Sequence, residues 1–207
     1  MAVSLPAGWQ NLFLIGYRGT GKSTVARLLA ERLSWQAVDA DEVLEAQAGR
    51  SIQAIFQTAG ETTFRDLESQ VVAQLAQGER QVVALGGGAV LREQNRVALA
   101  GRGVVLWLDA SATTIEQRLQ LDPLTQQRRP NLTAAGGNAE IRELLARRAP
   151  IYAAVAHQRV ETDGYSPGEV AAAIERWLRL TGSWPGEPVA VTPTDSRSRP
   201  VPRGGSA

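Results

Sequence analysis

The chain has no cysteine, one histidine and only one lysine among its 22 basic residues. Without cysteine it forms neither disulfides nor thiolate metal sites, which is typical of a reducing compartment, so we expect the cytoplasm. His157 alone is too little for a multi-histidine metal site or a Ser-His-Asp triad. Since arginine fills every other basic position, Lys22 indicates a site that needs a compact ammonium group.

Long apolar runs are also absent, because no stretch approaches the roughly 20 residues that span a bilayer. The first ten residues do not resemble a secretory signal. A net charge of +1 provides no broad basic field for nucleic acid or anionic lipid. We therefore expect neither a nucleic-acid nor a membrane partner. The other expectations for partners are a small-molecule substrate and a monomeric state.

Five short apolar segments alternate with segments of helical periodicity, which is typical of an α/β protein with a parallel sheet covered on both faces. The expected strands are residues 11–16, 36–38, 81–85, 103–108 and, more weakly, 158–162. Ser166, Pro167 and Glu169 form a capping-box pattern that predicts a last helix ending near Leu180. The sequence thus predicts a three-layer fold with a five-stranded parallel sheet.

Composition divides the chain into three parts. We expect a short N-terminal extension at residues 1–10 and one folded domain at residues 11–180, a size that buries a core without disulfides. Half of the ten prolines fall in residues 181–207, beside Gly, Ser and Thr. This composition predicts a disordered C-terminal tail.

Residues 16–23 match the P-loop pattern GxxxxGK[ST] and lie between an expected strand and an expected helix. Glycines in such a loop let backbone N–H groups surround phosphates at a helix N-terminus. Lys22 would bridge the β- and γ-phosphates of ATP, and the Ser23 hydroxyl would coordinate Mg²⁺. The predicted nucleotide-binding residues of this segment are Gly16, Gly19, Thr20, Gly21, Lys22, Ser23 and Thr24.

A P-loop is shared by kinases, GTPases, motors and helicases. The guanine-reading motif Asn-Lys-x-Asp requires a second lysine, which the chain lacks. The chain is also short and has no second nucleotide-site signature, which argues against a helicase. Small-molecule kinases remain the main class.

Asp39 and Asp41 follow the second expected strand, at the sheet edge where α/β proteins bind ligands. One carboxylate could face the metal and the other the acceptor hydroxyl. The alternative is that Asp41 serves only as N-cap of a helix beginning at Glu42. Capping and acceptor binding do not exclude each other.

Further short motifs follow the P-loop along the chain. In chain order they are Asp39-Ala-Asp41, Gly49-Arg-Ser-Ile52, Ile55-Phe56 with Gly60-Glu61, Phe64-Arg65-x-x-Glu68, Leu85-Gly86-Gly87-Gly88-Ala89, Arg129-Pro130, and Arg147-Arg148-Ala149-Pro150-x-Tyr152. In their order and rough spacing the chain resembles the shikimate kinase family over about residues 12–178. The family's enzymes are P-loop kinases of chorismate and aromatic amino-acid biosynthesis that phosphorylate the 3-hydroxyl of shikimate.

The resemblance implies roles for four residues. Asp41 would bind the shikimate hydroxyls and help activate the attacking oxygen, while Asp39 would hold Mg²⁺ through water. Arg65 and Arg148 would grip the shikimate carboxylate, which suits forked guanidinium donors. Taken alone, Arg65 could instead be a helix charge paired with Glu61 or Glu68, and Arg148 could cover apolar surface.

The resemblance also implies a substrate-contacting loop, Gly86-Gly87-Gly88, a substrate-binding helical segment, and a mobile lid at about residues 121–137. Lid closure would exclude water and bring an arginine onto the phosphates. We choose Arg129 as this catalytic and nucleotide-binding residue, with Arg128 as the alternative. Arg118 matches a family position that packs on adenine, although Tyr165 replaces an arginine that some members carry there.

The sequence therefore predicts an ATP- and Mg²⁺-dependent shikimate kinase that acts by direct in-line transfer. Two rival functions stay open at this point. One is a kinase for another small polyol acid, such as gluconate. The other is a catalytically silent nucleotide-binding paralogue.

Overall fold

The computed structural model describes residues 9–121 and 137–180 of the chain. At its centre lies a parallel sheet of five strands in the order β2-β3-β1-β4-β5. The strands are β1 (Asn11–Ile15), β2 (Gln36–Asp39), β3 (Gln81–Ala84), β4 (Gly103–Asp109) and β5 (Gln158–Glu161). All five strands predicted from the sequence are confirmed, with ends that differ by one residue.

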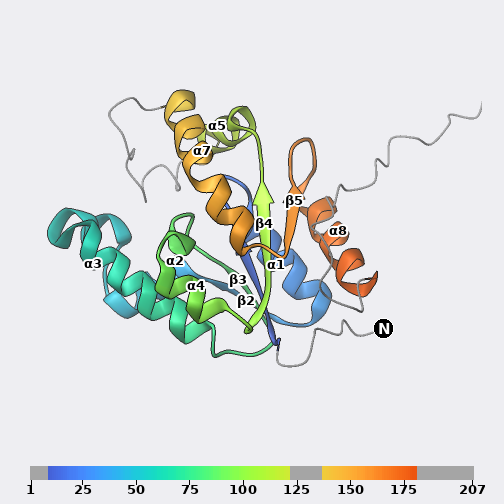
Figure 1. The fold of residues 1–207 in the computed structure, drawn as a ribbon, viewed down its shortest axis with the longest axis horizontal. Helices are drawn as coiled ribbons and strands as arrows, with labels where there is room; N and C mark the ends of the chain where they lie inside the picture. Colours follow the sequence, from blue (N-terminus) through green and yellow to red (C-terminus); the bar gives the residue numbers. More distant parts are fainter. Residues whose placement is uncertain (1–8, 122–136, 181–207) are drawn as a thin grey trace, which may run out of the picture.

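Helices cover both faces of the sheet, so the predicted three-layer fold is confirmed (Figure 1). The helices are α1 (Lys22–Leu33), α2 (Ala40–Ala48), α3 (Ile52–Leu75), the 3₁₀ turn η1 (Ala89–Leu91), α4 (Glu93–Leu99), α5 (Ala112–Gln120), α7 (Gly137–Val155) and α8 (Pro167–Leu180). Side chains alternate along β1, so that Leu12 and Leu14 pack with α1 and α8. Phe13 and Ile15 pack on the opposite face with α2, α3 and α4.

Local sequence signals set the start of α8 and the kink of α3. Ser166 and Glu169 form the predicted capping box: the Ser166 N–H donates to Glu169 Oε2 at 2.8 Å, and the Glu169 N–H donates to Ser166 Oγ at 3.3 Å. Helix α3 is kinked at Gly60, where φ is 78° and ψ is 175°. The kink sets the direction of the half of α3 that carries Arg65.

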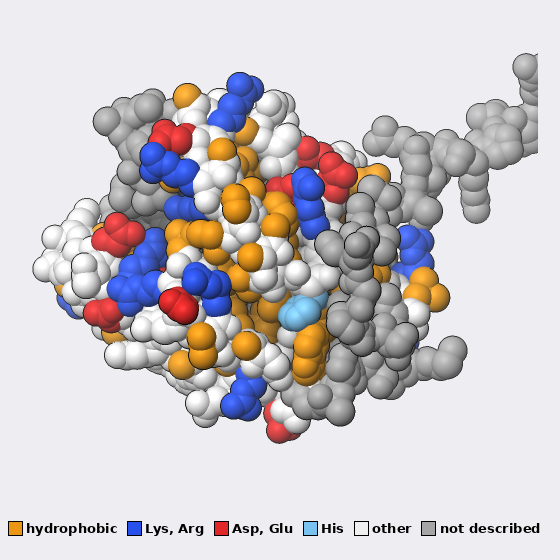
Figure 2. Space-filling model, viewed as in Figure 1, with side chains coloured by type: hydrophobic (Ala, Val, Ile, Leu, Met, Phe, Trp, Pro, Cys, Tyr) orange, Lys and Arg blue, Asp and Glu red, His pale blue; other side chains and the backbone are white. Residues whose placement is uncertain are grey.

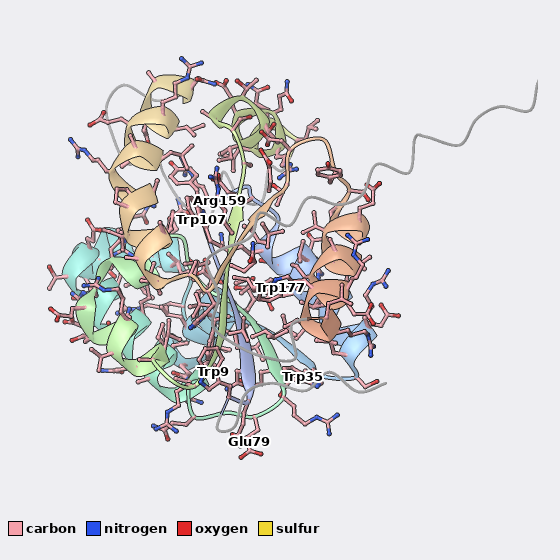
Figure 3. The ribbon with its side chains drawn as sticks, turned by 45° about the vertical axis from the view of Figure 1, so that its right-hand side comes forward. Trp9, Trp35, Glu79, Trp107, Arg159 and Trp177 are labelled. Carbon is pink, nitrogen blue, oxygen red and sulfur yellow. The ribbon has the colours of Figure 1, made fainter. Side chains whose placement is uncertain are left out.

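The single histidine has a structural position before β5. The ring Nδ1 of His157 accepts a hydrogen bond from the Val105 N–H at 2.9 Å, and the backbone N–H of His157 donates to the Val105 carbonyl at 2.8 Å. The ring reaches the surface in Figure 2 and packs on Trp9 with 4.5 Å between the ring centroids. Trp9 lies at the opposite end of the sheet from Trp107, which is near the carboxyl end of β4 (Figure 3). His157 therefore lies away from the ligand-binding edge.

In the described part of the chain, no helix is both long and apolar enough to cross a membrane. Most of the expected extension, most of the expected lid and all of the expected tail fall on residues 1–8, 122–136 and 181–207, outside the described ranges. These three assignments stay predictions.

Candidate active site

The loop between β1 and α1 forms the predicted cradle at the carboxyl end of the sheet. Gly16 has a φ of 135°, and a Cβ at this position would lie 2.2 Å from the Leu108 carbonyl oxygen. Gly21 has a φ of 90° and is the N-cap of α1. Only glycine tolerates both conditions without strain, so the glycines of the motif have a direct physical reason.

Lys22 is the first residue of α1 and is buried. Its Nζ donates hydrogen bonds to the carbonyl oxygens of Gly16 at 2.9 Å and Tyr17 at 2.8 Å. These bonds hold the ammonium inside the loop, next to the N-terminus of α1. A compact charge with several donors fits this space, as the solitary lysine of the sequence suggested.

Ser23 and Asp39 lie side by side, because the Ser23 hydroxyl donates to Asp39 Oδ2 at 2.5 Å. The other carboxylate oxygen of Asp39 accepts the Asp41 N–H at 3.0 Å, which makes Asp39 the N-cap of α2. The alternative that Asp41 caps a helix starting at Glu42 is therefore wrong. The helix begins two residues earlier because Asp39, at the strand end, supplies the capping oxygen.

A cavity of about 400 Å³ opens at this edge of the sheet. It brings together the phosphate loop, both aspartates and the glycine loop after β3. Its lining includes the predicted site residues Gly19, Thr20, Gly21, Lys22, Ser23, Thr24, Asp39, Asp41, Gly86, Gly87 and Arg118. Residues from five separate segments thus meet around one space.

Arg118 and Tyr165 both line the cavity. The Arg118 guanidinium donates to the Thr162 hydroxyl at 3.0 Å and to the Thr162 carbonyl at 2.7 Å. Burial lowers the pKa of Arg118, and the nearby charge of Asp163 opposes that effect. Bonds at its edge leave the flat face of a guanidinium available for stacking on a base.

The glycine loop lies between the phosphate loop and the two predicted carboxylate-binding arginines. A Cβ on Gly87 would lie 3.2 Å from the Gly16 carbonyl oxygen and 3.3 Å from the Arg18 nitrogen. A Cβ on Gly88 would lie 2.5 Å from Nη1 of Arg65. The absence of side chains here allows both neighbours to approach the loop closely.

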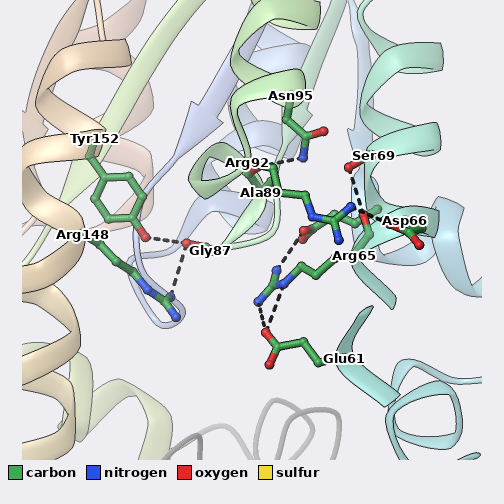
Figure 4. A network of polar contacts seen from close by, with 11 residues as sticks. Glu61, Arg65, Asp66, Ser69, Gly87, Ala89, Arg92, Asn95, Arg148 and Tyr152 are labelled. Carbon is green, nitrogen blue, oxygen red and sulfur yellow. Dashed lines mark hydrogen bonds and ion pairs between the residues drawn. The ribbon is translucent and has the colours of Figure 1, made fainter. Parts of the chain in front are cut away.

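Arg148 and Arg65 reach toward the glycine loop from α7 and α3 (Figure 4). Arg148 is 9% exposed and donates from Nη1 to the Gly87 carbonyl at 3.3 Å. The Tyr152 hydroxyl donates to the same oxygen at 2.5 Å. Neither arginine is part of the cavity lining itself, but both adjoin the loop that forms its wall.

Arg65 forms the ion pairs that the simpler interpretation foresaw. Its Nη1 lies 2.8 Å from Oε2 of the buried Glu68, and its Nη2 lies 3.1 Å from Oε1 of Glu61. Burial lowers the pKa of Arg65, but the charge and hydrogen bonds of Glu68 and Glu61 outweigh it, so the net pKa is raised. The side chain is 13% exposed, so it is not a solvated helix charge.

Comparison with known proteins decides the family. The family model described as shikimate kinase matches residues 18–179. A shikimate kinase of Symbiobacterium thermophilum is 46% identical over 83% of this chain and 98% of its own length. The chain belongs to the shikimate kinase family.

Solved shikimate kinases share the fold. The enzyme of Acinetobacter baumannii, solved in complex with shikimate, superposes with a TM-score of 0.76 at 34% identity, over 82% of this chain and 93% of that one. The enzyme of Aquifex aeolicus gives a TM-score of 0.69 at 32% identity, over 81% of this chain and 95% of that one. The predicted fold class is confirmed by these relatives.

The shikimate kinase site contains residues that sequence reasoning missed. Arg18 occupies a variable position of the P-loop pattern and lines the cavity. Thr162 holds Arg118, and Tyr152 holds Gly87, as described above. Only Tyr152 had a sequence signal, as part of the last family motif. Arg128 and Arg129 lie outside the described residues, so the assignment of a lid arginine stays a prediction.

Proposed function

We propose that this shikimate kinase family member transfers the γ-phosphoryl group of ATP to the 3-hydroxyl of shikimate within the 400 Å³ cavity. The observation that carries the proposal is the convergence of the phosphate loop, Lys22 and Asp41 on one space walled by the glycine loop. The arginines that would hold the acceptor adjoin that wall. We infer direct transfer by positioning and charge stabilisation, without a covalent enzyme intermediate.

The phosphate end of the cavity supplies positive charge from both side chain and backbone. The Lys22 ammonium lies inside the loop, and the N-terminus of α1 adds its dipole. Both favour the β- and γ-phosphates and the charge that spreads over the transferring group. Lys22 therefore acts as a catalytic residue and the loop glycines as binding residues.

The oxygens of Ser23 and Asp39 fit Mg²⁺, which prefers hard oxygen ligands. Mg²⁺ bound at such a site typically keeps several waters and shares the phosphates of the substrate. Bound there, Mg²⁺ would neutralise phosphate charge during transfer.

Asp41 would orient the acceptor hydroxyl and accept its proton. It lines the same cavity as Lys22 and lies two residues after Asp39, the N-cap of α2. Its backbone N–H donates to Asp39 Oδ1, which fixes the position of Asp41 in the first turn of α2. A positioned carboxylate of this kind typically contributes a factor of about 10² to 10⁴ in rate.

Arg148 would bind the shikimate carboxylate together with Arg65. Among the described residues, no carboxylate lies within ion-pair distance of Arg148, whereas Arg65 has Glu61 and Glu68. A ligand carboxylate would balance the charge of Arg148. Gly86, Gly87 and Gly88 would let the acceptor approach the backbone.

Four assignments rest on the family resemblance and the sequence. Arg118 would stack on adenine, and Arg129 from the lid would reach the phosphates. A cytoplasmic location and a monomeric state remain predictions.

An ADP-release assay tests the proposal. Purified protein with ATP and Mg²⁺ should release ADP when shikimate is added and release little without it. Gluconate, added at the same concentration, should give no more than the background rate. A larger response to gluconate would overturn the acceptor assignment, and ATP binding without turnover on either acceptor would overturn the kinase assignment.

A further inference from the structure

Glu140 is a buried carboxylate in the first turn of α7, and the mechanism above does not use it. The residue is 1% exposed. Burying a carboxylate is costly unless a charge or hydrogen bonds compensate it. Its Oε1 lies 3.9 Å from Nη2 of Arg18, a residue of the phosphate loop.

The start of α7 is held against the phosphate loop by packing. Ile141 and Leu144 form an apolar cluster with Tyr17 and with Ile115 of α5. The side-chain amide of Asn138 donates to Oε2 of Glu116 at 2.9 Å, which also ties α7 to α5. These contacts fix the start of α7, and with it the backbone of Glu140, beside the phosphate loop.

Arg18 lies at the acceptor end of the cavity. It lines the cavity, and its backbone nitrogen is close to Gly87. Its guanidinium carbon is 5.9 Å from the centroid of the Tyr17 ring, and that of Arg148 is 5.4 Å from the same centroid. The two guanidinium groups therefore share one aromatic ring, next to the glycine loop.

Like charges that contact the same ring repel each other, and the repulsion is stronger where little water screens it. Arg18 has an exposed side-chain fraction of 15%, and Arg148 is 9% exposed. A carboxylate within ion-pair distance of Arg18 offsets this repulsion and limits the directions in which the side chain can point. Glu140 is such a carboxylate.

We propose that Glu140 is a positioning residue, which holds the Arg18 guanidinium at the acceptor end so that Arg18 adds to the binding of the anionic acceptor. The inference rests on the proposed function, because it assumes that a carboxylate-bearing acceptor binds beside Arg148. It assigns Glu140 no contact with substrate. Its effect passes through Arg18.

The test is a double-mutant cycle in the ADP-release assay, with Glu140→Gln, Arg18→Met and the double variant. Each single variant should raise the KM for shikimate about fivefold to tenfold, with the KM for ATP changed less than about twofold. The double variant should be no worse than Arg18→Met. Glu140→Asp should recover part of the loss.

Glu143→Gln is the matched control, since Glu143 lies on the same helix and pairs with Arg147 in an exposed ion pair. This variant should leave both KM values unchanged. If Glu140→Gln lowers the unfolding temperature but leaves the KM for shikimate as in the wild type, Glu140 is merely structural and the proposal fails.

Arg18→Met decides the matter even if Glu140→Gln does not fold. A wild-type KM for shikimate in Arg18→Met, or strictly additive effects in the double variant, would overturn the proposal. Wild-type protein that shows no shikimate-dependent ADP release would instead refute the proposed function. The two failures are thus distinguishable.

Discussion

The two ends of the cavity are built in different ways. The phosphate end comes from one continuous segment, in which the loop after β1 and the first turn of α1 supply nearly all the groups. The acceptor end is lined by Asp41 of α2 and by the glycine loop after β3, and the kinked helix α3 and the distant helix α7 approach that loop from outside the cavity. One end therefore depends on local backbone geometry, and the other on tertiary packing.

This difference predicts different responses to substitution. A change at the phosphate end should reduce catalysis while the acceptor is still bound. A change at the acceptor end should weaken binding of the acceptor or, at Asp41, slow the activation of its hydroxyl, while the nucleotide is bound normally. The following variants test the contrast in order of expected effect.

Lys22→Met should have the largest effect, because it removes the charge held within the phosphate loop. We expect kcat to decrease about 10³-fold, as for loss of a major electrostatic stabiliser. Lys22→Arg should recover little, since a guanidinium is larger and planar. Steady-state kinetics with Arg27→Met, an exposed position on α1, serve as control. A Lys22→Met kcat within tenfold of wild type would contradict the assignment.

Asp41→Asn should decrease kcat about 10²-fold, because the amide cannot accept the proton of the acceptor hydroxyl. The KM for ATP should change little, since the backbone contact of Asp41 with Asp39 is retained. Glu42→Gln, the exposed neighbour, is the matched control. Near-normal turnover in Asp41→Asn would remove Asp41 from the catalytic residues.

Arg148→Met should lower kcat/KM for shikimate about 10²-fold, as expected when one partner of a buried charge pair is lost. The matched control is Arg147→Met, because Arg147 is adjacent but 72% exposed and pairs with Glu143. Its kinetics should equal those of the wild type. Equal losses in both variants would mean that any substitution in this part of α7 impairs the enzyme. The assignment of Arg148 as a carboxylate-binding residue would then fail.

Protonation of His157 should have the smallest effect and leave kcat/KM unchanged, since the residue lies away from the cavity. Burial lowers the pKa of His157 in the folded protein. The unfolded chain therefore takes up the proton first as the pH falls, and stability is lost below the unfolded pKa of about 6.5. Urea unfolding at pH 5 and pH 8 measures this loss, and His157→Asn should reduce it. An unchanged pH dependence in His157→Asn would assign the effect to other groups.

The sequence predicted the strands of the sheet and the glycine-rich loop before α1 for a physical reason. Apolar strands, glycines with positive φ and capping residues act over a few neighbouring positions, so their pattern is visible in the chain. Arg65 and Arg148 could be named only through resemblance to a family, because nothing local distinguishes them from surface arginines. Their neighbours along the chain, such as Arg147, have the same chemistry.

The helix start at Ala40 shows the limit of local reasoning. Two aspartates one residue apart can each cap a helix, and only the end of β2 decides that Asp39 does so. The partners Glu140 and Thr162 were likewise missed. Glu140 contacts Arg18 and Thr162 contacts Arg118, and both contacts join residues far apart in the sequence. No spacing in the sequence predicts such a contact.

The sequence by itself determined the parallel α/β fold, the phosphate loop and the class of chemistry, because these follow from periodicity and short-range backbone geometry. The tertiary structure alone decided which arginines are buried, which carboxylates balance them and which one faces the glycine loop without a carboxylate partner among the described residues. Charge balance depends on distances between segments far apart in the chain, and only folding sets those distances.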